Sequence, residues 1–224
     1  MLLAIDTSTD NASLALVGGD EAPAESTWHC EQNHTVELLP HVIRLLDEAN
    51  LSIKSVTGVI VAKGPGSFNG LRAGIATAKG LAFSLGIPII GISSLEVVAS
   101  QHAETGLPIC PIFNAGRGEI ATAIYQKKDS RWCQLVPEHI TTVDTLCPEI
   151  TTRTVFCGEF VAVIAQQLKK QFKNLAIIAA KELPRARLLA ELGRQRFEAG
   201  DYDSPTTLQP LYLRRPAITQ AKHR

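Results

Sequence analysis

Short apolar runs alternate with longer amphipathic stretches along the first half of the chain. Three runs of strand character come first, and Asp10-Asn11 and Gly18-Gly19 supply turns between them. These runs predict strands at 2–5, 12–17 and 25–30. Apolar positions at helical spacing then predict helices at 35–49, 70–85 and 94–103, with strands at 58–62 and 87–92 between them.

The second half repeats this order of elements more loosely. Apolar runs predict strands at 107–113, 119–125, 132–136, 154–157 and 175–179, and helices are expected at 142–146, 161–172 and 183–199. Two βββαβα-type halves are typical of the actin-like ATPase fold, which belongs to the wider RNase H-like group of α/β folds. We therefore expect an N-terminal actin-like lobe at 1–104, a reduced C-terminal lobe at 105–213 and a basic tail at 214–224.

Composition narrows the class of protein without identifying it. The chain has 224 residues, of which 45% are hydrophobic and 20% charged, as is ordinary for a globular protein. A formal net charge of zero argues against a dedicated nucleic-acid binder acting alone. The N-terminus lacks a basic leader, and no run reaches the roughly 18 apolar residues of a membrane helix. We expect a cytoplasmic protein, no membrane partner and reduced cysteines, because the five cysteines show no C-x-x-C pair.

The segment from Gly64 to Gly74 has the sequence GPGSFNGLRAG and is the most informative part of the chain. It follows a buried-strand pattern and begins a helix, which is the usual setting for an anion at a helix N-terminus. A phosphate-binding P-loop would need Gly-Lys where this chain has Asn69-Gly70. Its glycines are spaced one residue too widely for a dinucleotide fingerprint, and Ser67 lacks the flanking glycines of a nucleophile elbow.

Further motifs follow one another along nearly the whole chain: Leu3 to Ser8, His34-Thr35, Leu39-Pro40, Ser93 to Leu95, Arg117 to Glu119 and Pro210 to Arg214. Together with the glycine-rich segment they resemble the TsaB family, the small partner subunit in bacterial tRNA threonylcarbamoyladenosine synthesis. That family carries a GPGSFTGLRIG-like segment, so Asn69 and Ala73 are departures. The resemblance also implies the actin-like ATPase fold.

An actin-like ATPase would hold phosphate with one turn in each half. Asp6, Thr7 and Ser8 lie at the first position, where they could either hold a metal-bound phosphate or form a turn closed by the Asp6 side chain. The resemblance implies Asp-Ala-Arg at the second position, but this chain has Asn114-Ala115-Gly116. We therefore expect vestigial phosphate loops, no catalytic residues, no metal and no cofactor in this chain, with ATP only at the level of a complex. The residues of these loops are Asp6, Thr7, Ser8, Gly64, Gly66, Ser67 and Arg72.

Gly70, Gly74, Ala78 and Ala82 recur every fourth residue and form a stripe without bulky side chains on one helix. Such a stripe lets another element approach closely, either the protein's own sheet and first helix or a partner. The resemblance implies a four-helix contact between the helices at 35–49 and 70–85 and a TsaD-like catalytic subunit, and the same helices could form a homodimer. The residues expected at this interface are Thr35, Leu38, Val42, Leu45, Leu46, Gly70, Leu71, Ala73, Gly74, Thr77, Ala78 and Leu81.

These observations favour a non-catalytic scaffold that binds a TsaD-like subunit and, with it, a TsaE-like ATPase. The resemblance implies transfer of threonylcarbamoyl from its AMP ester to tRNA adenosine, with the metal and the chemistry in the partner. The C-terminal region is basic, and its charges are either a solvated face and a mobile end or a tRNA contact made only in the complex. They are Arg185, Arg187, Arg194 and Arg196 on the last helix and Arg214, Arg215, Lys222 and Arg224 in the tail. The alternatives are an active nucleotide-binding kinase or ATPase of the same fold, a peptidase and a nicotinamide enzyme.

Overall fold

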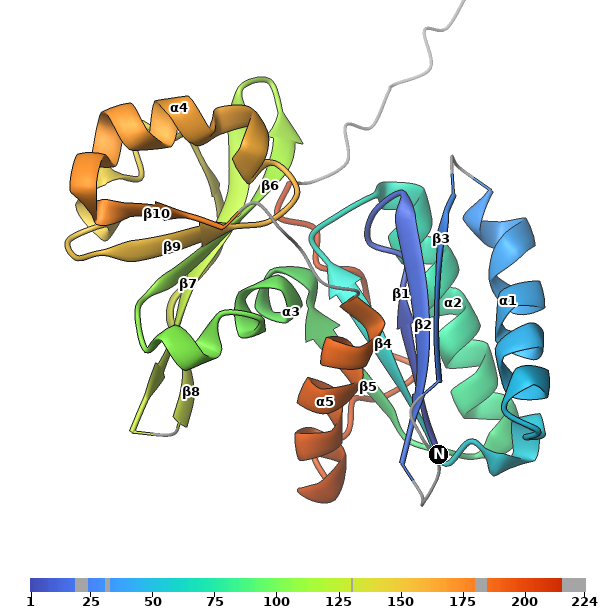
Figure 1. Cartoon of the computed structure of the whole chain (residues 1–224). Coiled ribbons are helices and arrows are strands. Elements are labelled where there is room, and N and C mark those ends of the chain that lie inside the picture. The colour runs from blue at the N-terminus through green and yellow to red at the C-terminus, as the bar shows by residue number, and fades with distance from the viewer. Residues whose placement is uncertain (19–23, 31–32, 130, 180–184, 215–224) are drawn as a thin grey trace, which may run out of the picture.

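The computed structural model describes residues 1–18, 24–30, 33–129, 131–179 and 185–214. Two five-stranded sheets lie side by side and carry helices on their faces (Figure 1). Among the described residues, no helix combines the length and the apolar character needed to cross a bilayer.

The first sheet joins an antiparallel meander to two parallel strands. Its strands are β1 (Leu2–Asp6), β2 (Asn11–Val17), β3 (Ala24–His29), β4 (Gly58–Gly64) and β5 (Ile89–Ser93). Their order is β3-β2-β1-β4-β5, with β1 antiparallel to β2 and parallel to β4. Strands β1, β4 and β5 are parallel, so they end at the same edge of the sheet. Their last residues, Asp6, Gly64 and Ser93, therefore lie along that edge.

The second sheet repeats this topology strand for strand. It consists of β6 (Ile109–Gly116), β7 (Glu119–Lys128), β8 (Arg131–Thr141), β9 (Thr154–Cys157) and β10 (Ala176–Ile178), in the order β10-β9-β6-β7-β8. Here β6 pairs antiparallel with β7 and parallel with β9, as β1 does with β2 and β4. The duplicated βββαβα order confirms the predicted actin-like ATPase fold.

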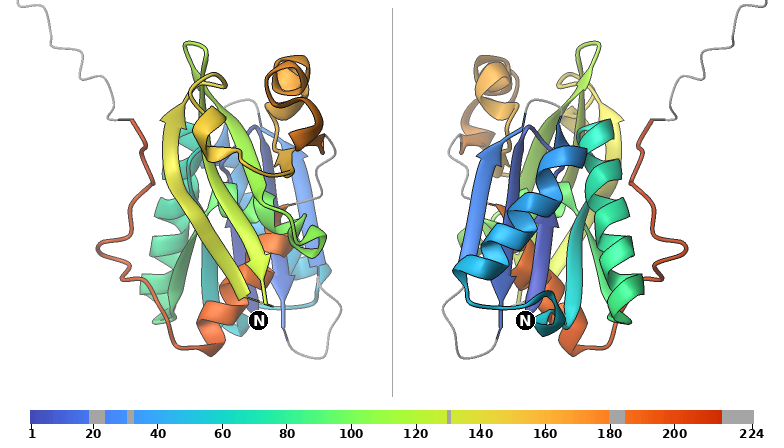
Figure 2. Two further views of the ribbon diagram at one scale, coloured as in Figure 1. Left: turned by 90° about the vertical axis from the view of Figure 1, so that its left-hand side faces the viewer. Right: turned by 90° about the vertical axis from the view of Figure 1, so that its right-hand side faces the viewer.

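Helices cover both faces of the first sheet. Helices α1 (His34–Glu48) and α2 (Phe68–Leu85) run side by side over one face (Figure 2, right), where they bury Leu3, Ile5 and Leu14. The alternate residues Leu2 and Ala4 point to the other face, as the two-residue period of a strand requires. Helix α5 (Arg185–Glu198), from the end of the chain, covers that face with Ala186, Leu189 and Ala190.

The second sheet is covered less fully. Helix α4 (Val161–Phe172) packs on one face through Leu168 and Phe172. Helix α3 (Ser94–Ser100) follows the first sheet in the chain but packs on the other face of the second sheet through Leu95 and Val98. The predicted helix at 142–146 is wrong: turns occupy that stretch, followed by the short 3₁₀ helix η3 (Cys147–Glu149). This half therefore has no counterpart of α1, in agreement with a reduced lobe.

Residues 201–211 run along the first sheet and cover its outer strand. The backbone N–H of Asp203 donates to Ile89 O at 2.9 Å, and the Asp203 carboxylate accepts from Gly91 N at 2.8 Å. Leu208 is buried against Gly91, and Leu211 N donates to Lys63 O at 2.6 Å. The division at residue 104 stays a prediction, and the structure adds that α5 and this segment contact the first sheet.

Candidate functional site

The glycine-rich turn joins β4 to α2 and is held closely against the turn between β1 and β2. Ser67 N donates to Ser8 O at 2.7 Å, and the Ser67 hydroxyl caps α2 by accepting from Gly70 N at 3.3 Å. A Cβ at Gly66 would overlap Ser8 O. The small residues of this turn are therefore required by contacts within the chain.

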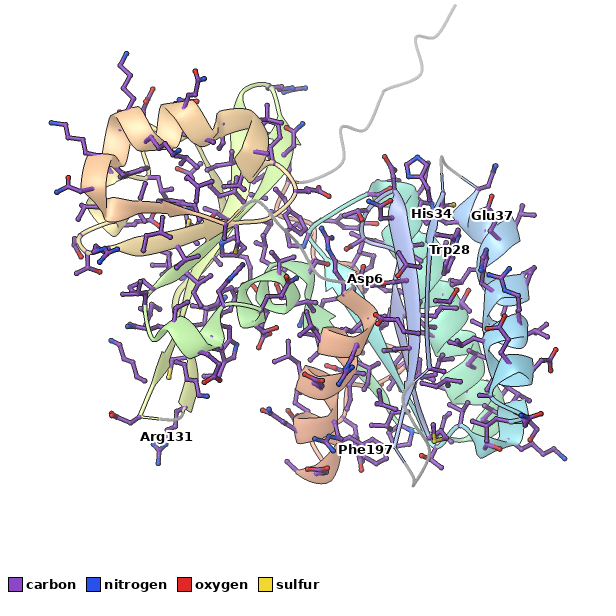
Figure 3. All side chains as sticks on the ribbon, viewed as in Figure 1. Asp6, Trp28, His34, Glu37, Arg131 and Phe197 are labelled. Atoms are coloured by element: carbon purple, nitrogen blue, oxygen red, sulfur yellow. The ribbon has the colours of Figure 1, made fainter. Side chains whose placement is uncertain are left out.

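Asp6, Thr7 and Ser8 are fully buried at the end of β1, where Figure 3 labels Asp6. One Asp6 oxygen, Oδ1, accepts from Ser8 N at 2.8 Å and from Ser8 Oγ at 2.6 Å. Thr7 Oγ1 donates to Gly70 O at 2.7 Å. These bonds match the closed turn that the sequence left as one alternative, and they occupy the donors that a phosphate would need. The other Asp6 oxygen, Oδ2, is buried without a hydrogen bond to the described residues.

The second candidate clamp also forms a turn of its own. Asn114 Oδ1 accepts from Gly116 N at 2.8 Å and is exposed. Asn114, Gly66 and Tyr212 share a cavity of about 200 Å³, which is smaller than the roughly 300–1,000 Å³ of most ligand sites. Glu119 pairs with Arg214 rather than with its neighbour Arg117. Nothing in this arrangement favours nucleotide chemistry.

Arg72, which was counted with the possible phosphate loops, is bonded to Tyr212, which lines the same cavity as Gly66. Its Nε donates to the Tyr212 hydroxyl at 3.1 Å, and its guanidinium lies 4.1 Å from the centre of the Phe68 ring. The three side chains form an exposed cluster at the start of α2. Within the part of the chain that the structure describes, no three His, Cys, Asp or Glu side chains come together as metal ligands.

Most of the predicted interface residues lie inside the protein. Gly70 and Gly74 face the β1–β2 turn, where a Cβ at either position would overlap Thr7. Thr35 is exposed, and Thr77 and Leu81 are half-buried. The buried members, which cannot reach a partner in this structure, are Leu38, Val42, Leu45, Leu46, Gly70, Leu71, Ala73, Gly74 and Ala78.

The outward face of α1 and α2 carries a different apolar set. Val36 is 74% exposed, Ile43 59% and Leu39 47%, and they follow one another at i, i+3 and i+7 along α1. Phe83 on α2 is 81% exposed. Val36, Leu39 and Ile43 belong to the same apolar stretch as Val42 and Leu46, but the helix separates them into an outer and an inner stripe. We call Val36, Leu39, Ile43 and Phe83 the outer apolar face.

The N-terminal half of α1 is fixed against the edge strand β3, as the labelled side chains of Figure 3 show. Trp28 Nε1 donates to Glu37 Oε2 at 3.2 Å, and the Trp28 ring stacks on His41 at 3.8 Å. His34 is buried, with its Nε2 3.2 Å from Thr9 O. These contacts fix the orientation of α1 about its own axis, so its part of the outer apolar face points in a fixed direction.

The arginines of α5 have acidic partners instead of forming a free basic face. Arg187 pairs with Glu191, Arg194 with Glu198, and Arg196 with Asp201 and Asp203. Arg185 is buried and lies 3.6 Å from Glu159. The basic tail from Arg215 to Arg224 lies outside the described residues.

Known proteins resemble this chain over nearly its whole length. The family described as "TsaD: tRNA N6-adenosine threonylcarbamoyltransferase" matches residues 28–222. A Bacillus subtilis protein named tRNA threonylcarbamoyladenosine biosynthesis protein TsaB is 36% identical over 218 residues, covering 95% of this chain and 93% of that protein. The chain belongs to the TsaB family.

Two further comparisons agree with membership of the TsaB family. The Escherichia coli protein of the same name is 29% identical over 223 residues, covering 95% of this chain and 94% of that protein. A Pseudomonas aeruginosa crystal structure, described as an uncharacterized protein with similarity to peptidase YEAZ, superposes with a TM-score of 0.82 at 26% identity. It covers 95% of this chain and 99% of that one.

The two departures from the TsaB pattern in the glycine-rich segment fall in different environments. Asn69 is exposed in the first turn of α2, so its side chain is free to vary. Ala73 is buried one turn further on, between α2 and the interior. Neither contacts the Asp6 turn through a hydrogen bond described in the structure.

Proposed function

We propose that this TsaB-family chain takes part in the biosynthesis of threonylcarbamoyladenosine in tRNA as a non-catalytic scaffold. It binds a TsaD-like catalytic subunit and, with it, a TsaE-like ATPase, while threonylcarbamoyl passes from its AMP ester to tRNA adenosine. The chain meets tRNA only within that complex. The names of its relatives support the pathway, and the outer apolar face of α1 and α2 supports the scaffold role.

The outer apolar face has the character of a helix-packing surface. Val36, Leu39 and Ile43 form one stripe on α1, and α2 beside it exposes the small residues Ala76 and Gly80. A ridge beside a row of small residues accepts the ridge of another helix. Burying such side chains contributes about 25 cal/mol for each Å² of apolar area removed from water. The proposed interface therefore moves from the inner to the outer side chains of the helices that the sequence indicated.

The absence of catalysis in this chain is supported by the turns at Asp6 and Asn114. Both use their side-chain oxygens to close their own backbone. An active kinase or ATPase of this fold would need those groups free for a metal-bound phosphate. The cavity beside Asn114 has a volume of about 200 Å³, below the range of most ligand sites.

Light scattering on a size-exclusion column tests the scaffold role. The chain is run alone, and then mixed with the TsaD of its own organism. We expect a one-to-one complex for the natural chain, and at least about tenfold weaker binding for Val36→Asp and Ile43→Asp, because interface hot spots cost 2 kcal/mol or more. Val163→Asp is the matched control, since Val163 is 72% exposed on α4, far along the chain from the face.

Each result of this experiment points to a different interface or partner. A complex that survives Val36→Asp and Ile43→Asp but not Val163→Asp would move the interface to the second half. No complex at micromolar concentration would exclude the scaffold role and return attention to nucleotide binding at Asp6. A dimer of the chain alone that dissociates when TsaD is added would show that both associations use the same face.

A further inference from the structure

A second cleft lies between the two sheets, away from the outer apolar face. It has a volume of about 750 Å³, within the range of most small-molecule sites. Its floor comes from the end of β5 and the start of α3, and its walls from β8 and the second half of α5. In Figure 3, Arg131 marks the tip of the β7–β8 hairpin on one side and Phe197 marks α5 on the other.

One wall of the cleft is aromatic and rigid. Trp132 stacks on the buried Tyr125 with ring centres 5.6 Å apart and planes 2° from parallel. Trp132 Nε1 donates to Glu96 Oε1 at 3.2 Å, and Tyr125 donates through its hydroxyl to Glu138 Oε1 at 3.1 Å. Leu192 on α5 adds an apolar contact on the opposite wall. These bonds hold two carboxylates in fixed positions beside an aromatic plane.

Charges of both signs line the cleft, and four of them make no ion pair with a described residue. Arg196 is bound to Asp201 at 2.6 Å and to Asp203, so its charge is already balanced. The remaining charged side chains, Lys63, Arg131, Glu96 and Glu138, make no ion pair with any described residue. Two cations and two anions thus face the same space.

The pKa values of the acids reflect this environment. Burial raises the pKa of the Glu96 carboxyl, and the charge of Glu138 adds to the rise, while the Trp132 hydrogen bond and Lys63 oppose it. For Glu138, burial also raises the pKa, but the polar groups of Gln134, its own backbone, Ser93 and Tyr125 nearby lower the pKa overall. A cation placed between the two acids would stabilise the charged form of both.

The floor also holds a polar group with spare bonding capacity. Ser93 is only 3% exposed and lines the cleft, and its Oγ has no partner of normal hydrogen-bond geometry among the described residues. It lies near the side chains of Tyr125 and Glu138. A buried hydroxyl without a partner costs free energy, which a bound polar group would recover.

From this geometry we propose that the cleft binds a small zwitterion of the α-amino acid class. Glu96, Glu138 and Ser93 receive the ammonium group, and Lys63 receives the carboxylate. The side chain of the ligand lies against Trp132 and Leu192, so an apolar side chain fits best. This site is independent of the scaffold role and of the outer apolar face.

Leucine and its two fragments test this proposal on the isolated chain. Isoamylamine is leucine without its carboxylate, and 4-methylpentanoate is leucine without its ammonium group. The chain has two tryptophans, so a Trp28→Phe background lets fluorescence report on Trp132 alone, and titration calorimetry measures the same affinity. We expect leucine to bind with a dissociation constant of about 1 mM or less, and each fragment at least about tenfold more weakly.

Two charge variants test which side chains bind the ammonium group and the carboxylate of leucine. Glu96→Gln keeps an oxygen acceptor for Trp132 but removes the charge, and Lys63→Met removes the cation while keeping the stem; each should weaken leucine binding at least about tenfold. Asp47→Asn, an exposed acid on α1, should leave binding unchanged. Thermal unfolding of each variant confirms that it is folded. No signal up to about 10 mM leucine, fragments that bind as well as leucine, or full binding in both charge variants would each overturn the proposal.

Discussion

Thr7 explains why α2 contains glycine in two successive turns. Its carbonyl oxygen lies where a Cβ of Gly70 would be, and its Oγ1 lies where a Cβ of Gly74 would be. The same hydroxyl donates to Gly70 O. Glycine inside a helix costs up to about 1 kcal/mol relative to alanine, so close packing of the β1–β2 turn is the compensating contact. The third glycine, Gly80, has open space around it.

This difference gives a matched pair of substitutions on one helix. Gly74→Ala should destabilise the chain by about 1–3 kcal/mol, because the added methyl overlaps Thr7 and forces the turn away. Gly80→Ala should instead stabilise it by up to about 1 kcal/mol through helix propensity. Urea unfolding followed by circular dichroism measures both. Changes of the same sign in the two variants would contradict the role given to Thr7.

Residue patterns in the sequence located the Asp6 turn, the glycine-rich turn and the two helices, but not the direction in which their side chains point. Val36 and Leu39 belong to the same apolar stretch as Leu38 and Val42, and a helix in isolation gives no sign of which stripe meets the sheet. Arg72 next to glycines suggested an anion site, yet its partner is Tyr212, 140 residues away in the chain. A contact between residues so far apart in the chain leaves no local pattern in the sequence.

At the scale of elements, the edge of β5 shows how a short segment can protect a sheet. The Asp203 backbone donates to Ile89 O, its carboxylate accepts from Gly91 N, and Arg196 donates to Gly91 O at 3.1 Å. These three bonds satisfy backbone groups that an open edge would offer to another chain. The segment 201–211 therefore protects this edge through a few polar contacts, as a sixth strand would.

Asp203→Ala should cost about 1–3 kcal/mol of stability, since it leaves Gly91 N without its acceptor in a half-buried position. Amide hydrogen exchange should show lost protection at Gly91. Asp201→Ala is the control, because Asp201 also binds Arg196 but contacts no strand. An equal loss of stability in both variants would assign the effect to Arg196 alone.

The order of elements along the chain was the part of the fold that the sequence predicted best, because a run of three strands followed by further helices and strands occurs twice. The boundaries were less accurate. Strand β8 continues to Thr141 instead of ending at Val136, since its pairing with β7 passes through two irregularities that break the simple alternation. Helix α2 begins at Phe68, two residues before the glycine that the pattern suggested, because Ser67 caps it.

For the whole molecule, the two halves exchange their last helices. Helix α3 ends the first half but packs on the second sheet, and α5 ends the second half but packs on the first. Gly193 of α5 meets Ile60 of β4 so closely that a Cβ would overlap it. Helix α5 covers the face formed by Leu2, Ala4 and Val17.

A fragment of residues 1–104 should therefore be poorly folded, although it contains all five strands of the first sheet. Its uncovered apolar face favours association, as exposed patches of this kind do. Circular dichroism and light scattering of the fragment, beside the full chain, test this. The full chain should unfold in one transition, and a monomeric, cooperatively folded fragment would show that the halves are independent.

The exchange of helices also has a consequence on the ribosome. At about 5–20 residues per second, the roughly 100 residues between the end of the first half and the end of α5 take about 5–20 s to synthesise. During that interval the nascent first sheet has one face covered by α1 and α2, while the other still lacks α5. The growing chain should therefore depend on chaperones that shield apolar surface until α5 has been synthesised.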